Sequence, residues 1–218
     1  MPERWEDRDS RGNGSYRVAD RFWWNLLWTT DASRLASFSF GIGGTQGNLG
    51  DWTDHATFGV TLRPSDRISA DFDVTYRHRD GWIVYQGDGN FGAYHGADWQ
   101  PSMKLNWFIA PQHQIRWSLQ WAGVRVEERG FYAVPDGDGP LTPTTRTQPS
   151  HDFTVSLLTT QIRYRWEIAP LTDLFIVYNR GNTLPNQVDV PLTDLFSDAF
   201  DNPIVDSYVA KLRYRFGN

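Results

Sequence analysis

The stretch Ile68–Arg77 reads ISADFDVTYR, and every second residue in it is apolar or aromatic. The two alternating sets are Ile68, Ala70, Phe72, Val74 and Tyr76, and Ser69, Asp71, Asp73, Thr75 and Arg77. Side chains of a strand point alternately to its two faces, so this period of two predicts a β-strand with one apolar and one charged face. The stretch Tyr208–Phe216 alternates in the same way. Strands of this kind are typical of membrane β-barrels.

The composition agrees with a barrel and disfavours other classes. The 218 residues include 11 Trp, 9 Tyr and 13 Phe, a load of aromatic rings that is expected where rings gather at two membrane–water interfaces. The mean hydropathy is negative, and no run approaches the roughly 18 apolar residues of a membrane-spanning helix. The net charge of −5 disfavours a nucleic acid as a partner.

The pattern predicts nine strands, most of them reaching the roughly 9–11 residues that a tilted transmembrane strand needs. Residues 1–19 are expected to be a polar lead-in or external loop, and residues 20–218 to be an outer-membrane β-barrel segment. The strands are predicted at about 20–30, 33–43, 54–63, 67–79, 98–109, 114–128, 152–168, 173–181 and 204–216.

The predicted connections alternate between short and long ones. Outer-membrane barrels have short periplasmic turns and long external loops, so this asymmetry assigns the two sides. Asp80-Gly81, followed by Trp82–Tyr85, is predicted to be a two-residue hairpin turn with a short return strand. The short turns are 31–33, 64–66, 110–113 and 169–172, and the long loops are about 44–53, 80–97, 129–151 and 182–203.

The hexapeptide PLTDLF occurs twice. Pro170–Phe175 is predicted to open a strand, and Pro191–Phe196 to start a short helix inside a long loop. One repeated hexapeptide is too little to indicate a structural repeat.

An odd number of strands, nine, bears on whether the barrel can close. Bacterial single-chain barrels have an even number of strands with both ends inside. The C-terminus is expected on the short-turn side, so at least one further strand is expected upstream. An incomplete, antiparallel up-and-down transmembrane β-barrel is the predicted fold.

Four segments carry a resemblance to a known family. They are Trp5–Gly12 (WEDRDSRG), Lys104–Tyr132 (KLNWFIAPQHQIRWSLQWAGVRVEERGFY), Ile162–Gly181 (IRYRWEIAPLTDLFIVYNRG) and Ser207–Phe216 (SYVAKLRYRF). The chain resembles the C-terminal barrel portion of a family of outer-membrane proteins of unknown function. Full-length members of that family usually carry a family-9-like carbohydrate-binding module in front of the barrel.

The resemblance implies a bacterial outer-membrane location with lipid as a partner. A glycan would be reached through the upstream module, which these residues do not contain. The C-terminal stretch also resembles the aromatic-terminated signal that barrel-assembly machinery reads, which makes that machinery an expected partner. The residues of this candidate signal are Tyr208, Leu212, Tyr214 and Phe216.

The charged face of the predicted strands supplies the candidate site. In a barrel these side chains would line the lumen, where opposite charges on neighbouring strands pair and brace the wall. The functional interpretation is a selectivity surface for a permeating solute. The candidate lumen-lining residues are Asp71, Asp73, Lys104, Arg116, Arg163, Arg165, Lys211, Arg213 and Arg215.

No residue pattern predicts chemistry. Asp71 and Asp73 resemble a glycosidase carboxylate pair in spacing, but any alternating polar strand produces such a pair. The histidines lack metal-ligand spacing, and neither a nucleophile elbow nor a phosphate-binding glycine loop is present, so we predict no catalytic residue, metal or cofactor. Most tryptophans are expected in interfacial girdles. The candidates for ligand contact in or beside the loops are Trp52, Trp82 and Trp99.

These features predict an outer-membrane β-barrel that acts as the anchor or conduit of a glycan-related surface protein, without chemistry of its own. One alternative is part of a membrane-associated hydrolase whose active site lies upstream or in the external loops. Another is a soluble lipocalin-like barrel that binds an apolar ligand inside, in which the two faces would be reversed.

Overall fold

The computed structural model describes residues 1–145, 151–184, 186 and 190–214. The protein consists of strands and one helix. In chain order these are β1 (Arg4–Glu6), β2 (Tyr16–Val18), β3 (Trp23–Thr29), β4 (Ala36–Gln46), β5 (Trp52–Ser65), β6 (Ile68–Gly87), β7 (Asn90–Ala110), β8 (His113–Ala133), β9 (Thr142–Pro143), β10 (Phe153–Ala169), β11 (Thr172–Leu184), α1 (Leu192–Asp201) and β12 (Val205–Arg213).

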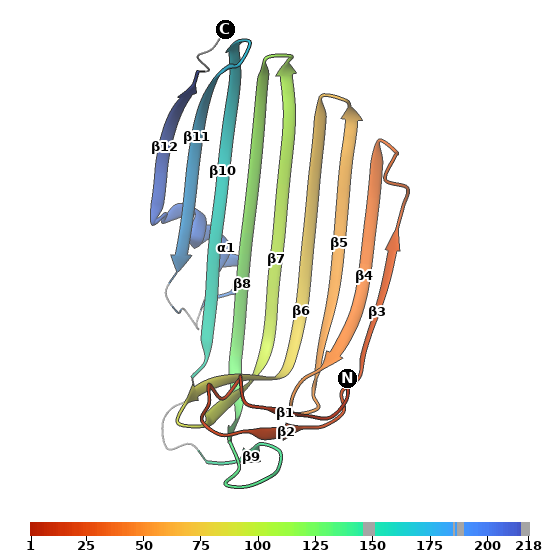
Figure 1. Cartoon of the computed structure of the whole chain (residues 1–218), viewed down its shortest axis with the longest axis vertical. Coiled ribbons are helices and arrows are strands. Elements are labelled where there is room, and N and C mark those ends of the chain that lie inside the picture. The colour runs from red at the N-terminus through yellow and green to blue at the C-terminus, as the bar shows by residue number, and fades with distance from the viewer. Residues whose placement is uncertain (146–150, 185, 187–189, 215–218) are drawn as a thin grey trace.

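One large antiparallel sheet holds the long strands, in the order β12-β11-β10-β8-β7-β6-β5-β4-β3, with the short β9 beside β8. The sheet meanders up and down, as Figure 1 shows. The nine predicted strands correspond to β3–β8 and β10–β12. Over the described residues the edge strands β3 and β12 do not pair with each other, so the sheet is open. The prediction of an antiparallel up-and-down sheet that does not close is therefore confirmed.

The connections follow the predicted asymmetry at the short-turn end. Ala110 pairs directly with His113, and Ala169 pairs with Thr172, which leaves two residues in each turn. At the other end the strands are longer than predicted, because β6 and β7 remain paired up to Gly87 and Asn90. Much of the expected long loop 80–97 is thus a protruding β-hairpin.

The predicted hairpin turn at Asp80-Gly81 is wrong. The turn lies at Asp88-Gly89, whose φ values of 50° and 72° are both positive, as a two-residue type I′ turn requires. At Asp80-Gly81 the register of β6 against β7 shifts between Arg79 and Trp82. Gly81, with a φ of 62°, supplies the backbone conformation of this bulge.

The two faces of the sheet carry different kinds of side chain. One cross-strand row is apolar, and its neighbour on the opposite face is polar or charged. The apolar row contains Phe38, Val60, Phe72, Met103 and Leu119 on β4–β8. On β10 and β11 it continues with Thr160 and Arg180, and the guanidinium of Arg180 donates to the backbone of Phe200 in α1. The polar row contains Ser37, Thr61, Asp71, Lys104, Ser118, Gln161 and Asn179. We call these the apolar face and the polar face.

The N-terminal residues fold onto the end of the sheet opposite the short turns. β1 and β2 pair with each other, and Tyr16 and Val18 are buried against Phe91 of β7 and Leu141. Figure 1 shows the tip of the β6–β7 hairpin turning aside and crossing this end of the sheet with β1 and β2. The segment expected as a polar lead-in thus holds two buried apolar side chains, together with the buried polar residues Glu6 and Ser10. We call residues 1–21 the N-terminal cap.

The helix α1 arises from the second PLTDLF hexapeptide, so the prediction that this copy starts a short helix is confirmed. Leu195 and Ala199 of α1 are buried against Trp121 and Leu158 of the apolar face. The first copy forms a turn and the start of β11, as predicted. None of the helices in the described part of the chain has the length and apolar character needed to cross a membrane.

Candidate functional site

The structure places the described candidate lumen residues on the polar face. They lie on β6 (Asp71, Asp73), β7 (Lys104), β8 (Arg116), β10 (Arg163, Arg165) and β12 (Lys211, Arg213). Arg215 lies outside the described residues. Hollows of about 350 and 290 Å³ indent this face, and Arg116 and Arg163 line both of them.

Asp173 joins three strands of the sheet. Its carboxylate is almost fully buried and accepts a hydrogen bond from Nε of Arg165 on β10 at 2.7 Å. Arg213 of β12 also donates to this carboxylate. Arg165 reaches Glu167 at 3.3 Å as well. These charge-assisted contacts hold β10, β11 and β12 together at the short-turn end.

Arg116 and Arg163 have a different environment. They lie directly opposite each other on β8 and β10, and like charges in this position repel. Over the described residues neither guanidinium makes an ion pair; the side chain of Arg163 donates to the amide of Gln161 at 3.3 Å. The nearby Asp71 accepts from the hydroxyl of Thr61 at 2.7 Å. Lys104, Arg116 and Arg163 outnumber Asp71 around the larger hollow, so the polar face presents a net positive charge there.

A larger cavity, of about 820 Å³, lies at the opposite end of the polar face, where the cap covers it. We call it the vestibule. The cap contributes Arg8, Asp9, Arg11 and Arg21 to its lining, and the sheet contributes His55 of β5 together with Arg77, Arg79, Asp80, Trp82 and Tyr85 of β6. The cap arginines were not predicted as site residues, because they follow no strand alternation. Arg77 was assigned to the charged face of its strand but was not among the site candidates.

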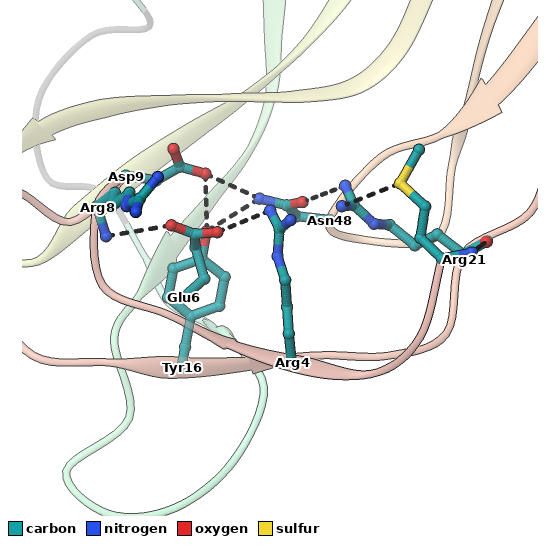
Figure 2. A network of polar contacts seen from close by, with 8 residues as sticks. Arg4, Glu6, Arg8, Asp9, Tyr16, Arg21 and Asn48 are labelled. Carbon is teal, nitrogen blue, oxygen red and sulfur yellow. Dashed lines mark hydrogen bonds and ion pairs between the residues drawn. The ribbon is translucent and has the colours of Figure 1, made fainter.

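Asn48 fastens the cap to the sheet, as Figure 2 shows. The Nδ2 amide of Asn48 donates to Asp9 and to the phenol oxygen of Tyr16, each at 3.0 Å. Its Oδ1 accepts from Nη1 of Arg21 at 2.7 Å. Asn48 lies in the connection between β4 and β5, so the network links the middle of the cap and its last residue, Arg21, to the sheet.

Tyr16 and Glu6 complete the buried side of this network. The phenol of Tyr16 donates to Asp9 at 3.3 Å. Burial of Tyr16, reinforced by the negative charge of Asp9, raises the pKa of the phenol well above its ordinary value near 10. Glu6 accepts from the backbone N–H of Arg8 at 3.1 Å and pairs with Arg4 at 2.7 Å (Figure 2).

The sheet side of the vestibule is organised by Asp98 of β7. Its fully buried carboxylate holds Arg79 at 2.6 Å and Arg77 at 3.4 Å. The guanidinium of Arg79 also lies over the ring of Trp82, 4.6 Å from its centroid. One carboxylate is thus shared by two guanidinium groups, both of which line the cavity.

The three tryptophans predicted to contact a ligand are not brought together. Trp82 lines the vestibule. The ring of Trp52 packs against the ring of Phe22, with 6.2 Å between their centroids. Trp99 lies on the apolar face beside Tyr76, with 4.9 Å between the ring centroids. Over the described residues no group of three or more histidine, aspartate or glutamate side chains is arranged to hold a metal ion.

The candidate assembly signal lies at one edge of the sheet. The ring of Tyr208 on β12 packs against Tyr178 at 4.7 Å, and Leu212 and Tyr214 are exposed. Phe216 lies outside the described residues.

The sequence profile of a family described as "Domain of unknown function (DUF5916)" matches residues 5–216. No curated protein matches this chain, and no solved structure does so either. The family match covers the cap from Trp5 onwards, the long strands β3–β8 and β10–β12, and α1.

Proposed function

We propose that this chain, which belongs to the DUF5916 family, is an outer-membrane β-barrel segment that serves as the anchor or conduit of a glycan-related surface protein. The observation that carries this proposal is the separation of an apolar face from a polar face along the long strands of the sheet. Such a separation suits a barrel wall with lipid on its outer side and water on its inner side.

The apolar face supports contact with lipid. Large side chains on it stay two-fifths exposed in the middle of long strands, among them Phe72 at 41%, Ile162 at 40% and Ile176 at 42%. In water an apolar surface that extends over so many strands would be covered by a second layer. Over the described residues α1 covers this face at Trp121 and Leu158, near the end with long connections.

The polar face supports a hydrated interior. Its rows of hydroxyl, amide and charged side chains are what the lumen of a membrane barrel contains. The lipocalin-like alternative would need the opposite placement, with the apolar side chains inside.

The further partners follow from the resemblance described above. Barrel-assembly machinery would read the C-terminal aromatic stretch, and a carbohydrate-binding module in front of the barrel would provide the contact with glycan. In this proposal the sheet holds that module at the cell surface and does no chemistry itself.

Neighbouring residues of β10 allow a direct test. The chain has no cysteine, so Ile162→Cys on the apolar face and Gln161→Cys on the polar face each accept one environment-sensitive fluorophore. After refolding with phospholipid vesicles and flotation, we expect blue-shifted emission and quenching by brominated lipid at position 162 but not at 161. Equal emission at both positions, or a chain that remains soluble below the vesicles, would contradict the proposal.

A further inference from the structure

We infer that the vestibule binds a small organic anion that carries carboxylate or phosphate groups, held between the cap and the polar face. This site is separate from the hollows near Arg116 and Arg163. It requires no membrane around the sheet, so it stands or falls independently of the proposed function.

The charge of the lining points to an anion. Five arginines line the cavity, namely Arg8, Arg11, Arg21, Arg77 and Arg79. The carboxylates that oppose them are Asp9 and Asp80 in the lining and the buried Asp98 behind it. Positive charge therefore prevails here, although the whole chain carries a net charge of −5.

The cap arginines have hydrogen-bond donors to spare. Over the described residues neither Arg8 nor Arg11 forms an ion pair, and Arg11 instead lies over the ring of Tyr85, 5.4 Å from its centroid. Arg21 donates to a neutral amide, that of Asn48. An arginine fork matches the planar, bidentate geometry of carboxylate and phosphate oxygens, and such charge-assisted hydrogen bonds are the strong ones.

The opposite wall offers apolar contact to an organic group that carries the anion. Trp82, Ile83 and Tyr85 of β6 also line the cavity, so its surface offers apolar contact as well as charge. A volume of about 820 Å³ lies within the range of cavities that hold small organic ligands and far exceeds what one inorganic ion fills. Aromatic groups with a few convergent charges are the usual make-up of such a site.

The cap is built to respond to a ligand. It is anchored by the burial of Tyr16 and Val18 in β2 and by the bonds of Asn48 to Tyr16 and to Asp9 in the β1–β2 turn. Arg8 and Arg11 lie in the turn between β1 and β2, and Arg77 and Arg79 lie on the sheet. An anion that contacts both sets joins the cap to the sheet and so stabilises the closed arrangement.

Isothermal titration of the full chain in detergent tests this inference, with citrate and inorganic phosphate as probes and sucrose as the neutral control. All titrations are made at one ionic strength. We expect saturable binding of citrate, phosphate or both at a single site, and no binding of sucrose. Citrate alone would identify a carboxylate ligand, and phosphate alone a phosphorylated one. Binding of sucrose, or of neither anion, would overturn the inference.

Variants locate the site. The double variant Arg8→Gln/Arg11→Gln should weaken anion binding tenfold or more. The control Arg17→Gln lies in the same cap, but Arg17 pairs with Glu3 outside the vestibule, so its binding should be unchanged. An equal loss of anion binding in the double variant and in Arg17→Gln would mean a general attraction to the cap. A loss of binding only in Arg116→Gln/Arg163→Gln would place the anion in the hollows. Either result overturns the inference.

Hydrogen exchange gives an independent readout. The backbone amides of Tyr16, Arg17 and Val18 should exchange more slowly when the anion is bound, because opening of the cap then requires release of the ligand. The same amides in the ligand-free double variant should exchange as in the parent, which shows that the cap still folds. Binding without any protection of these amides would contradict a site between cap and sheet.

Discussion

Arg116 of β8 and Arg163 of β10 lie directly opposite each other on the polar face, without a carboxylate partner in the described part of the chain. Two rows closer to the short turns, Arg165 and Arg213 share the buried Asp173. Arginine therefore has two roles around one hollow of the polar face. One pair stabilises the sheet, and the other leaves positive charge available.

This difference predicts opposite effects of two equivalent substitutions on stability. Arg163→Gln should leave the free energy of unfolding unchanged or raise it by up to about 1 kcal/mol, because it removes a like-charge contact. Arg165→Gln should lower it by about 1–3 kcal/mol, since the buried Asp173 loses one charged donor. Urea unfolding in detergent measures both. A larger loss in Arg163→Gln than in Arg165→Gln would refute this division of roles.

Adjacent residues of β6 should respond differently to a charge. Phe72→Arg on the apolar face should cost about 2–4 kcal/mol near the middle of a bilayer, whereas Asp73→Arg on the polar face should cost much less. Reversible unfolding from vesicles provides the measurement. Equal penalties would speak against lipid at the apolar face.

The cap should loosen in alkali because of Tyr16. The pKa of its phenol is raised by burial in the folded protein, so the folded state binds more protons than the unfolded state above pH 10. Stability from this group is complete below pH 10 and falls as pH rises above it. Absorbance near 295 nm should show a phenol that ionises well above pH 10.

The variant Tyr16→Phe is the control for that titration. It should lack the late-ionising phenol and its contribution to alkaline loss of stability. It also loses the hydrogen bonds to Asp9 and Asn48, which should cost about 1 kcal/mol near neutral pH. A late phenol that persists in Tyr16→Phe would assign the shifted pKa to another tyrosine.

The two ends of the sheet should differ in accessibility from outside the cell. Asp138→Cys, beyond β8 and on the side of the cap, should react with an impermeant thiol reagent on intact cells. Asp66→Cys, in the short turn between β5 and β6, should not, although both residues are exposed in the structure. The reverse labelling pattern would invert the proposed orientation.

The strands and short turns were predictable from the sequence because their signals are local. A period of two over Ile68–Arg77 specifies a two-faced strand, and a turn between Ala110 and His113 needs only its own residues. The turn at Asp88-Gly89 was missed because Asp80-Gly81 carries the same signal. The pairing of β6 with β7 along their whole length decides between the two sites, and that pairing is a tertiary property.

The vestibule could not be predicted from sequence patterns, because it also depends on tertiary contacts. Arg8 and Arg11 are far from Arg77 and Arg79 in the chain, and they meet because Tyr16 and Val18 are buried against Phe91. The two copies of PLTDLF make the same point. The Pro170 copy continues into a strand paired with β10, whereas the Pro191 copy becomes a helix packed on Trp121 and Leu158.

The position of the cap also constrains the order of folding. Tyr16 is synthesised before its buried neighbours Phe91 and Leu141, which follow much later in the chain. Closing so long a loop is slow, because its entropic cost comes before any contact is gained. The cap must therefore wait for the β6–β7 hairpin and the segment after β8, so it reaches its native place only after these later-made segments have formed.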